Sequence, residues 1–420
     1  MSELARLVRP ARVARVARVV RLDARGGALI AAVALLAADG AVAAWRGLEP
    51  GVADWDGAVA AVEGSVRWLG PLGAGLAAWT GLRAQRLDYL RALAARSPAV
   101  AVLHDLSVLV AVCVLGYAAG ALVACVRAFS VGGFGWIHPV GLTAGAATLA
   151  LFVIVGYLSG RLWAHPATVA AVVAGSAVWA SGRPRWGWAG LLPPVELGRV
   201  DLFEGLKGEV LAGQMFWAFG AGGVLVLGYV AAVTRRRGPA AAAAVALLVT
   251  AVCTLRLEAA GGVVTAPSAR EYSCRDWPVT VCVHPALKGA LPVLGAAVAP
   301  LATRLAGTPA AFGRVEQRSA REPAGVSGGT AAFHLTGLKD GFARRAVREI
   351  EAGLWRCPEP GLAGPGSYQA QVSAWLRDEP VPAAPAVPFT RWDEQRRRAW
   401  FTAHYPAYRV CGLGPASYAG

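Results

Sequence analysis

Four cysteines in the C-terminal part of the sequence have the types and spacing that most clearly predict chemistry. They are Cys274, Cys282, Cys357 and Cys411. An even number of cysteines in an oxidising compartment favours two disulfides, for which three connectivities exist. We prefer Cys274–Cys282 with Cys357–Cys411, because the first bridge closes a local turn and the second ties the chain end to a predicted helix. A zinc site is the alternative, although the spacing is not that of a zinc knuckle.

A second candidate is Asp39, the one acidic residue well inside an apolar stretch. Burying a carboxylate in hydrocarbon is costly unless it is paired or hydrated, so such a residue is a functional candidate. Asp39 also lies towards the outer end of its stretch. Hydration from the exterior is therefore the simpler interpretation.

Catalysis finds little support in the sequence. It has no Walker A segment, so it does not supply a P-loop ATPase site, and it has no H-E-x-x-H. His104, His284 and His334 are isolated and fit structural or surface roles. Cys113, Cys125 and Cys253 lie in apolar stretches and fit small packing residues. We therefore expect no enzyme, cofactor or metal.

The elements that must position these residues are apolar helices. Of all residues 56% are apolar and only 16% are charged, and the mean hydropathy is +0.47, whereas soluble domains average about 25% charged residues. Most of the apolar stretches approach the roughly 20 residues that a helix needs to cross a bilayer. Seven such stretches are present: 27–45, 66–82, 106–125, 140–162, 167–180, 215–233 and 240–255.

Arginines fall mostly on alternate connectors and set the expected orientation. Arg6, Arg9, Arg12, Arg15, Arg18, Arg21 and Arg25 precede the first stretch, so the N-terminus is expected in the cytoplasm. The loop 83–105 and the connector 234–239 carry further arginines on the same side. The connector 48–65, with Asp54, Asp56 and Glu63, is expected outside.

From residue 257 prolines, charges and turn residues become frequent and no apolar run is long enough to span a membrane, as in a soluble domain. We predict a helix at 342–354, a hairpin or turn at 275–283, a helix at 290–305, strands at 314–318 and 330–335, and a helix at 390–403. The fold class is thus an α-helical polytopic membrane protein, with about seven transmembrane helices and the N-terminus inside. It divides into a basic segment 1–26, a transmembrane domain 27–256 and an extracellular α+β domain 257–420.

The N-terminal arginines recur every three residues, with valines on the remaining surface between residues 12 and 22. That window fits a segment lying on anionic lipid at the inner leaflet. A nucleic-acid arm is the alternative for such a run, and tethering to a membrane span argues against it. The simplest reading is a topology determinant alone.

The loop 83–98 carries the strongest resemblance to a known family. Trp79-Thr-Gly-Leu-Arg-Ala-Gln-Arg86, then Leu90 and Leu93, then Ser97-Pro98 resembles the pattern after the second span of actinobacterial ABC-2-type permeases. Gly156-Tyr-Leu-Ser-Gly160-Arg161 is similar to a G-x-x-x-G-R ending in the same family.

That resemblance covers about residues 2–238 and implies a function. The family's usual plan has six spans with both ends inside, so a seventh span and an exterior domain depart from it. By this resemblance the chain is a permease-like subunit, paired as a homo- or hetero-dimer, that borrows ATP hydrolysis from a separate cytoplasmic ATPase. The coupling residues would be Arg86, Leu87, Leu90, Arg91 and Leu93. The alternative is a non-transporting membrane scaffold or sensor whose exterior domain binds a partner or an envelope component.

Overall fold

The computed structural model describes residues 26–52, 54–86, 98–182, 192–193, 200–261, 263–358, 363–364, 366–382 and 388–419. The chain forms two compact units, which are described separately. Unit 1 comprises Met1–Leu48, Asp54–Val200 and Gly205–Ala266. Unit 2 comprises Glu49–Ala53, Asp201–Glu204 and Pro267–Gly420.

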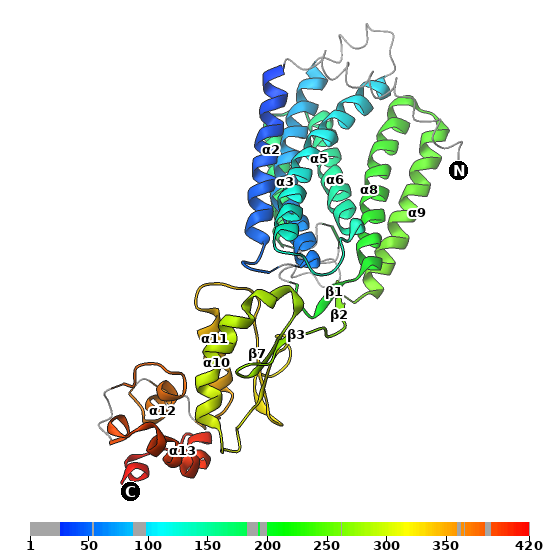
Figure 1. The fold of residues 1–420 in the computed structure, drawn as a ribbon. Coiled ribbons are helices and arrows are strands. Elements are labelled where there is room, and N and C mark those ends of the chain that lie inside the picture. The colour runs from blue at the N-terminus through cyan, green and yellow to red at the C-terminus, as the bar shows by residue number, and fades with distance from the viewer. Residues whose placement is uncertain are drawn as a thin grey trace. The chain divides into compact units, whose positions relative to one another are not determined.

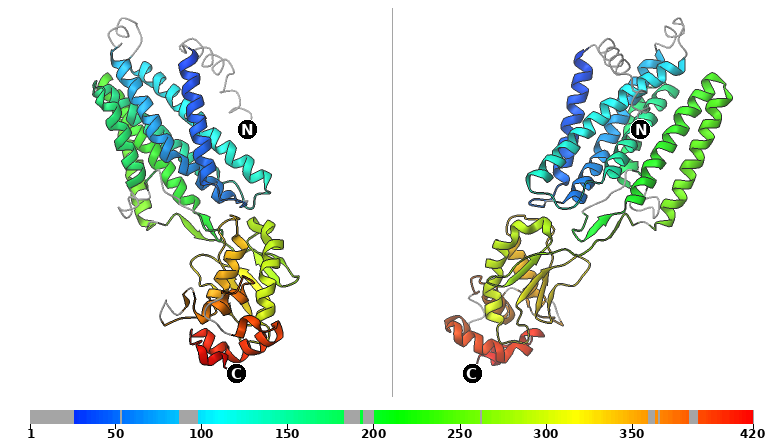
Figure 2. Two further views of the ribbon diagram at one scale, coloured as in Figure 1. Left: turned by 90° about the vertical axis from the view of Figure 1, so that its left-hand side faces the viewer. Right: turned by 45° about the vertical axis from the view of Figure 1, so that its right-hand side comes forward.

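Unit 1 is a bundle of long apolar helices (Figure 1). All seven apolar stretches predicted from the sequence lie within helices. These are α2 (Gly26–Gly47), α3 (Trp55–Arg86), α5 (Pro98–Ser130), α6 (Pro139–Leu162), α7 (Ala167–Gly182), α8 (Gly208–Thr234) and α9 (Arg237–Ala259). Both views in Figure 2 show α8 and α9 side by side, as expected for two helices joined by so short a turn.

Six helical segments in the described part of the chain are long and apolar enough to cross a membrane. They are Ile30–Gly47, Ala99–Ser130, Pro139–Leu162, Gly208–Thr234, Arg237–Ala259 and Pro285–Leu305. The last of these belongs to unit 2, where Leu287, Leu294 and Leu301 are fully buried in that unit's core. Two predicted spans are not among the six, because no 18-residue part of α3 is apolar enough and α7 has only 16 residues.

Two connectors are shorter than the sequence predicted. Helix α3 begins at Trp55 rather than near residue 66, because the Asp54 carboxylate accepts a hydrogen bond from the Gly57 amide (2.7 Å) and caps the helix. Glu63, expected in a hydrated connector, therefore lies inside the bundle. Helix α8 likewise begins at Gly208 rather than near residue 215. Helix α9 continues to Ala259, past the expected domain limit at residue 257.

Glycines allow α3 and α6 to pack backbone against backbone. A Cβ atom at Gly156 would lie 2.1 Å from the Ala74 carbonyl oxygen, and one at Gly160 would lie 2.1 Å from the Ala78 oxygen. No larger side chain fits at either position. The G-x-x-x-G pattern singled out in the sequence is thus a helix-packing motif of the kind that brings membrane helices together.

Unit 2 contains a mixed five-stranded sheet in the order β3-β4-β5-β7-β6. Its strands are β3 (Ser273–Arg275), β4 (Thr280–Val283), β5 (Arg314–Gln317), β6 (Gly325–Ser327) and β7 (Thr330–Phe333). β4, β5 and β7 run parallel, and β3 and β6 pair antiparallel at the two edges. The predicted hairpin and both predicted strands are confirmed. A separate two-stranded sheet pairs β1 (Glu204–Leu206) with β2 (Thr265–Pro267).

Helices complete the C-terminal α+β fold. The 3-10 helix η4 (Pro285–Ala290) leads into α10 (Leu291–Leu305), which connects parallel strands β4 and β5, as parallel pairing requires. After the sheet come α11 (Phe342–Ala352), α12 (Tyr368–Leu376), η6 (Pro388–Arg391), α13 (Glu394–Arg409) and η7 (Pro415–Tyr418). The predicted amphipathic helix corresponds to α11, whereas α12 was not predicted.

Two short segments from connectors of the helical region belong to unit 2. The Asp201 carboxylate accepts hydrogen bonds from the Ser319 hydroxyl and the Ala320 amide, each at 2.9 Å. The Pro50 carbonyl accepts a bond from the Leu338 amide at 2.6 Å. Unit 2 is therefore assembled from three separate pieces of the chain.

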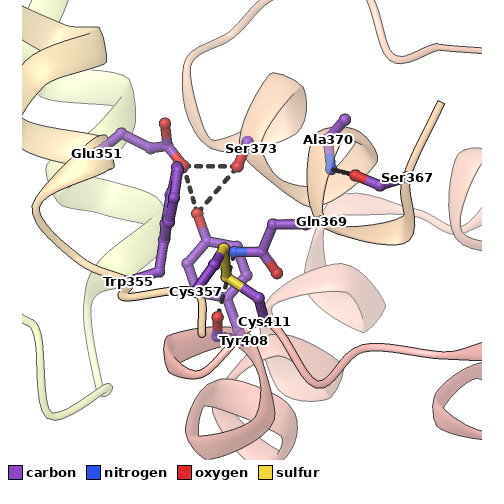
Figure 3. The surroundings of a disulfide bond; sticks show 9 residues. All are labelled: Glu351, Trp355, Cys357, Ser367, Gln369, Ala370, Ser373, Tyr408 and Cys411. Atoms are coloured by element: carbon purple, nitrogen blue, oxygen red, sulfur yellow. Dashed lines mark hydrogen bonds between the residues drawn. A yellow bond between two sulfur atoms is a disulfide. The ribbon is translucent and has the colours of Figure 1, made fainter. Parts of the chain in front are cut away.

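Both disulfides have the pairing preferred from the sequence. Cys274 is bonded to Cys282, which is its partner across the β3–β4 pair. Cys357 is bonded to Cys411 and joins the segment after α11 to the segment after α13 (Figure 3). Cys113, Cys125 and Cys253 are free and lie in α5 and α9, where Cys113 and Cys253 are buried.

A buried carboxylate holds the helices beside the second disulfide together. Glu351 of α11 is only 1% exposed. It accepts hydrogen bonds from Ser373 of α12 (2.6 Å), from Tyr408 of α13 and from the Trp355 indole (2.8 Å) (Figure 3). The Arg377 guanidinium pairs with its other oxygen at 3.0 Å. Burial, and next the charge of Glu351, raises the pKa of Tyr408 well above its ordinary value, so this hydroxyl stays a donor.

Candidate functional site

Polar side chains from three helices of unit 1 line one small cavity, and a tyrosine from a fourth helix lies beside its wall. Glu63 of α3, Thr148 of α6 and Gln214 of α8 line it, together with Val66, Ala144, Gly145 and Pro193. The Tyr117 hydroxyl of α5 lies against Gly145, where an added Cβ would be 2.2 Å from the phenol oxygen. We call Glu63, Tyr117, Thr148 and Gln214 the polar cluster.

The polar cluster is almost completely withdrawn from solvent. The four residues are 5%, 3%, 2% and 2% exposed, in the order Glu63, Tyr117, Thr148 and Gln214. The Thr148 hydroxyl donates to the Ala144 carbonyl (2.8 Å). Glu63 Oε1, Tyr117 Oη and Gln214 Nε2 make no hydrogen bond to any described residue. An unsatisfied buried polar atom costs about 1–3 kcal/mol, so three in one place suggest a function rather than packing.

The positions at which α3 and α8 begin determine how far along these helices the polar cluster lies. Glu63 lies just over two turns into α3, about 12 Å from its first residue, and Gln214 lies about 9 Å into α8. At the nearby helix ends, the His138 imidazole is 3.2 Å from the Asp56 carboxylate. Burial raises the pKa of Asp54, the capping residue, to about 6, although the Gly57 amide opposes this shift. Charged and capped helix ends thus precede a buried interior.

Asp39 lies elsewhere, at a larger cavity between α2 and α3. This cavity has a volume of about 550 Å³, and its lining also includes Arg46, Arg67 and several small residues. Asp39 is half-buried, and its Oδ2 atom makes no hydrogen bond to a described residue. The structure therefore does not bring Asp39 into the polar cluster.

The predicted coupling segment is outside the described residues, apart from its start. Helix α3 ends at Arg86 and α5 begins at Pro98, and Leu87, Leu90, Arg91 and Leu93 lie between these ends. The basic segment 1–25 is likewise outside the described residues. These assignments remain predictions.

Histidines of unit 2 have structural roles. His284 is 3% exposed, and its Nδ1 accepts a hydrogen bond from the Ala286 amide and so caps η4. Burial lowers the pKa of His284 to about 4, against a smaller opposing effect of Asp201. His334 is bonded through Nδ1 to the Glu349 carboxylate (2.5 Å) and through Nε2 to the Glu322 carbonyl (2.7 Å). Partial burial acts to lower the pKa of His334, but these hydrogen bonds and the Glu349 charge outweigh it and raise the pKa.

One short catalytic motif in unit 2 has a structural explanation. The residues 325–329 read Gly-Val-Ser-Gly-Gly and match G-x-S-x-G. In a hydrolase this motif turns from a strand into a helix, whereas here it is the antiparallel hairpin between β6 and β7. Gly328 and Gly329 have φ of +57° and +74° and form its turn. Nor do the described residues contain a group of His, Cys, Asp or Glu side chains that could hold a metal ion.

Comparison with known proteins gives no relatives. No protein-family model matches the chain, and no curated protein or solved structure is significantly similar to it.

The polar cluster was missed because its members are unremarkable one by one. Tyr117, Thr148 and Gln214 are single polar residues at or near apolar stretches, and Glu63 precedes the apolar part of its helix. The available signal was Asp54, a capping residue directly before a helical pattern. Beginning the helix there would have placed Glu63 inside the bundle.

Proposed function

We propose that this chain is a permease-like membrane subunit of an ABC-type transport system. The observation that carries the proposal is the polar cluster, because a bundle that serves only as an anchor gains nothing from unsatisfied polar atoms in its interior. Polar and ionisable residues inside membrane bundles mark substrate and ion pathways. The substrate itself remains open.

In this proposal α2, α3, α5, α6, α7, α8 and α9 cross the membrane, and the N-terminus is cytoplasmic. Helix α3 is not among the six helices selected by length and hydropathy, so the crossing by its residues 66–82 is part of this proposal. Arg235, Arg236 and Arg237 lie at the turn between α8 and α9, where the positive-inside rule expects them on the cytoplasmic side. An odd number of spans places unit 2 outside, where its two disulfides are stable.

The ATPase partner would bind the cytoplasmic segment 83–98. Leu87, Leu90 and Leu93 would insert into an apolar groove of the partner, with Arg86 and Arg91 at the rim. The N-terminal arginines would lie on anionic lipid beside it. Two copies of the chain, or this chain and a related one, would form the complete permease.

Co-purification with the ATPase tests this proposal. Apolar anchors at an interface centre lose more on truncation than rim charges do. We expect Leu90→Asp to abolish association with the ATPase and its stimulation while membrane insertion is unchanged. The matched variant Arg91→Ala should weaken association only slightly. Full association of Leu90→Asp would refute the coupling role.

A scaffold or sensor is the second candidate. It is favoured by unit 2, which has its own core and two disulfides and so could bind an envelope component without transport. Affinity purification that recovers no ATPase, but recovers an envelope component through unit 2, would support this alternative.

A further inference from the structure

We propose that the polar cluster is a proton-binding site, in which Glu63 holds a proton and the cavity holds one water molecule. The inference rests on the proposed function in taking α3, α5, α6 and α8 to lie in the membrane. It does not require an ATPase partner.

The hydrogen-bonding groups of the wall match a neutral carboxyl group and a water molecule. Gln214 presents a donor and Glu63 an acceptor, and the Tyr117 hydroxyl lies beside the wall, against Gly145. The Thr148 hydroxyl already donates its hydrogen to Ala144, so its lone pairs are left for a donor in the cavity. A water molecule is stable where two to four polar partners surround it. It would bridge these donors and acceptors.

The cavity has room for one water molecule and little else. Its volume is about 10 Å³, close to the roughly 10–15 Å³ that admits a single water. A divalent metal ion needs about six or more oxygen ligands, whereas this wall offers one carboxylate among neutral groups. Size and donor set therefore favour a proton with water over a metal ion.

Within the part of the chain that the structure describes, no cation acts on Glu63. The titratable side chain that faces it is Tyr117, a phenol. The elements around the cluster carry their charges at other positions, and α7 carries none. They are Asp39 and Arg46 on α2, Asp56, Arg67, Arg83 and Arg86 on α3, Asp105 and Arg127 on α5, Arg161 on α6, Glu209 on α8, and His104 and His138 at or near helix starts.

Proton exchange would follow hydration of the cavity. When the four helices separate and water enters, the Glu63 carboxyl can transfer its proton to water and leave a carboxylate and a hydronium ion. When the helices close, the carboxylate must take a proton back, because an unpaired charge in a dry bundle is costly. Closing of the bundle and proton binding would thus be linked.

Carbodiimide labelling of the full-length protein in liposomes tests this site. Dicyclohexylcarbodiimide reacts with a protonated carboxyl in apolar surroundings and leaves a stable adduct that mass mapping locates. We expect an adduct on Glu63 at neutral pH, and its loss at alkaline pH. The Asp39 carboxyl, which lies at a larger cavity whose lining includes Arg46 and Arg67, serves as the internal control and should remain unlabelled. In the variant Glu63→Gln the adduct should disappear from this peptide.

Infrared difference spectroscopy gives a second readout. A carboxyl C=O stretching band that shifts in D₂O should be present at neutral pH and absent from Glu63→Gln. Absence of both the adduct and the band in folded protein would overturn the proposal, and protection of Glu63 by Na⁺ would replace it with a metal-cation site. If Glu63 shows neither the adduct nor the band while the protein still associates with the ATPase, the proton site is refuted and the permease proposal is not. The Leu90→Asp experiment tests the permease proposal and says nothing about the proton site.

Discussion

Replacing Glu351 should release the helices at the end of unit 2. Glu351→Ala removes the acceptor for three donors and leaves the Arg377 guanidinium without one of its partners. Breaking a buried ion pair by deleting one member costs about 3–5 kcal/mol. Arg377 keeps a second partner, Glu379, at 2.9 Å. We therefore expect a loss of stability near the lower end, about 3 kcal/mol.

Two milder variants set the scale for this loss. Tyr408→Phe removes one hydroxyl from the same carboxylate and should cost about 1 kcal/mol. Glu379→Gln weakens ion pairs at the surface and should cost less than about 1 kcal/mol. The expected order is thus Glu351→Ala, then Tyr408→Phe, then Glu379→Gln.

Hydrogen–deuterium exchange on the full-length protein in detergent measures this effect locally. A loss of about 3 kcal/mol corresponds to exchange on the order of a hundredfold faster in peptides of α12 and α13, since each 1.4 kcal/mol is about tenfold. Peptides of the helical bundle serve as the internal control. Exchange in α12 and α13 that Glu351→Ala leaves unchanged would show that the carboxylate does not hold these helices together.

Three further perturbations test separate features. Reduction of Cys357–Cys411, whose partners are 54 residues apart, should destabilise the end of unit 2 by about 4 kcal/mol in the chain-entropy model. Four alkylatable thiols in unit 2 of freshly purified protein would show that the disulfides are absent and would contradict this prediction. Gly156→Ala forces a Cβ against the facing backbone of α3 and should cost about 1–3 kcal/mol in thermal unfolding, whereas Gly175→Ala meets open space and should have no such effect. The pKa of His284 is lowered from 6.5 to about 4, so its stabilising contribution is complete above pH 6.5 and is lost as the pH falls towards 4. Protection factors for amide exchange in β4 and η4 that stay constant over this pH window would refute this prediction.

The helical region was predictable because long apolar stretches have few alternatives. Every predicted stretch lies in a helix, since a long apolar segment satisfies its own backbone hydrogen bonds in that form. Helix limits were less predictable. The sequence prediction followed hydropathy and stopped where polar residues began, whereas Asp54 caps α3 before its apolar part and extends the helix past Glu63.

The candidate site depends on contacts that a single sequence does not contain. Glu63 and Gln214 are separated by most of the helical region, and they share a cavity because α6 packs against both α3 and α8. The G-x-x-x-G pattern was visible in the sequence, but the sequence does not show that it packs α6 against α3. In unit 2 the Cys274–Cys282 pairing followed from local spacing and Cys357–Cys411 from the expected tie between the chain end and a predicted helix. Helix α12 and the parallel strand order depend on tertiary packing.

Accessibility of a single introduced cysteine tests the central claim, that unit 1 spans the membrane with unit 2 outside. Ser327 is exposed at the β6–β7 hairpin, and Gly238 is exposed with open space around it at the start of α9. An impermeant thiol reagent applied to intact cells should label Ser327→Cys, and it should label Gly238→Cys only after lysis. The opposite pattern, with Ser327→Cys protected until lysis and Gly238→Cys labelled on intact cells, would contradict the topology and the transport proposal that depends on it.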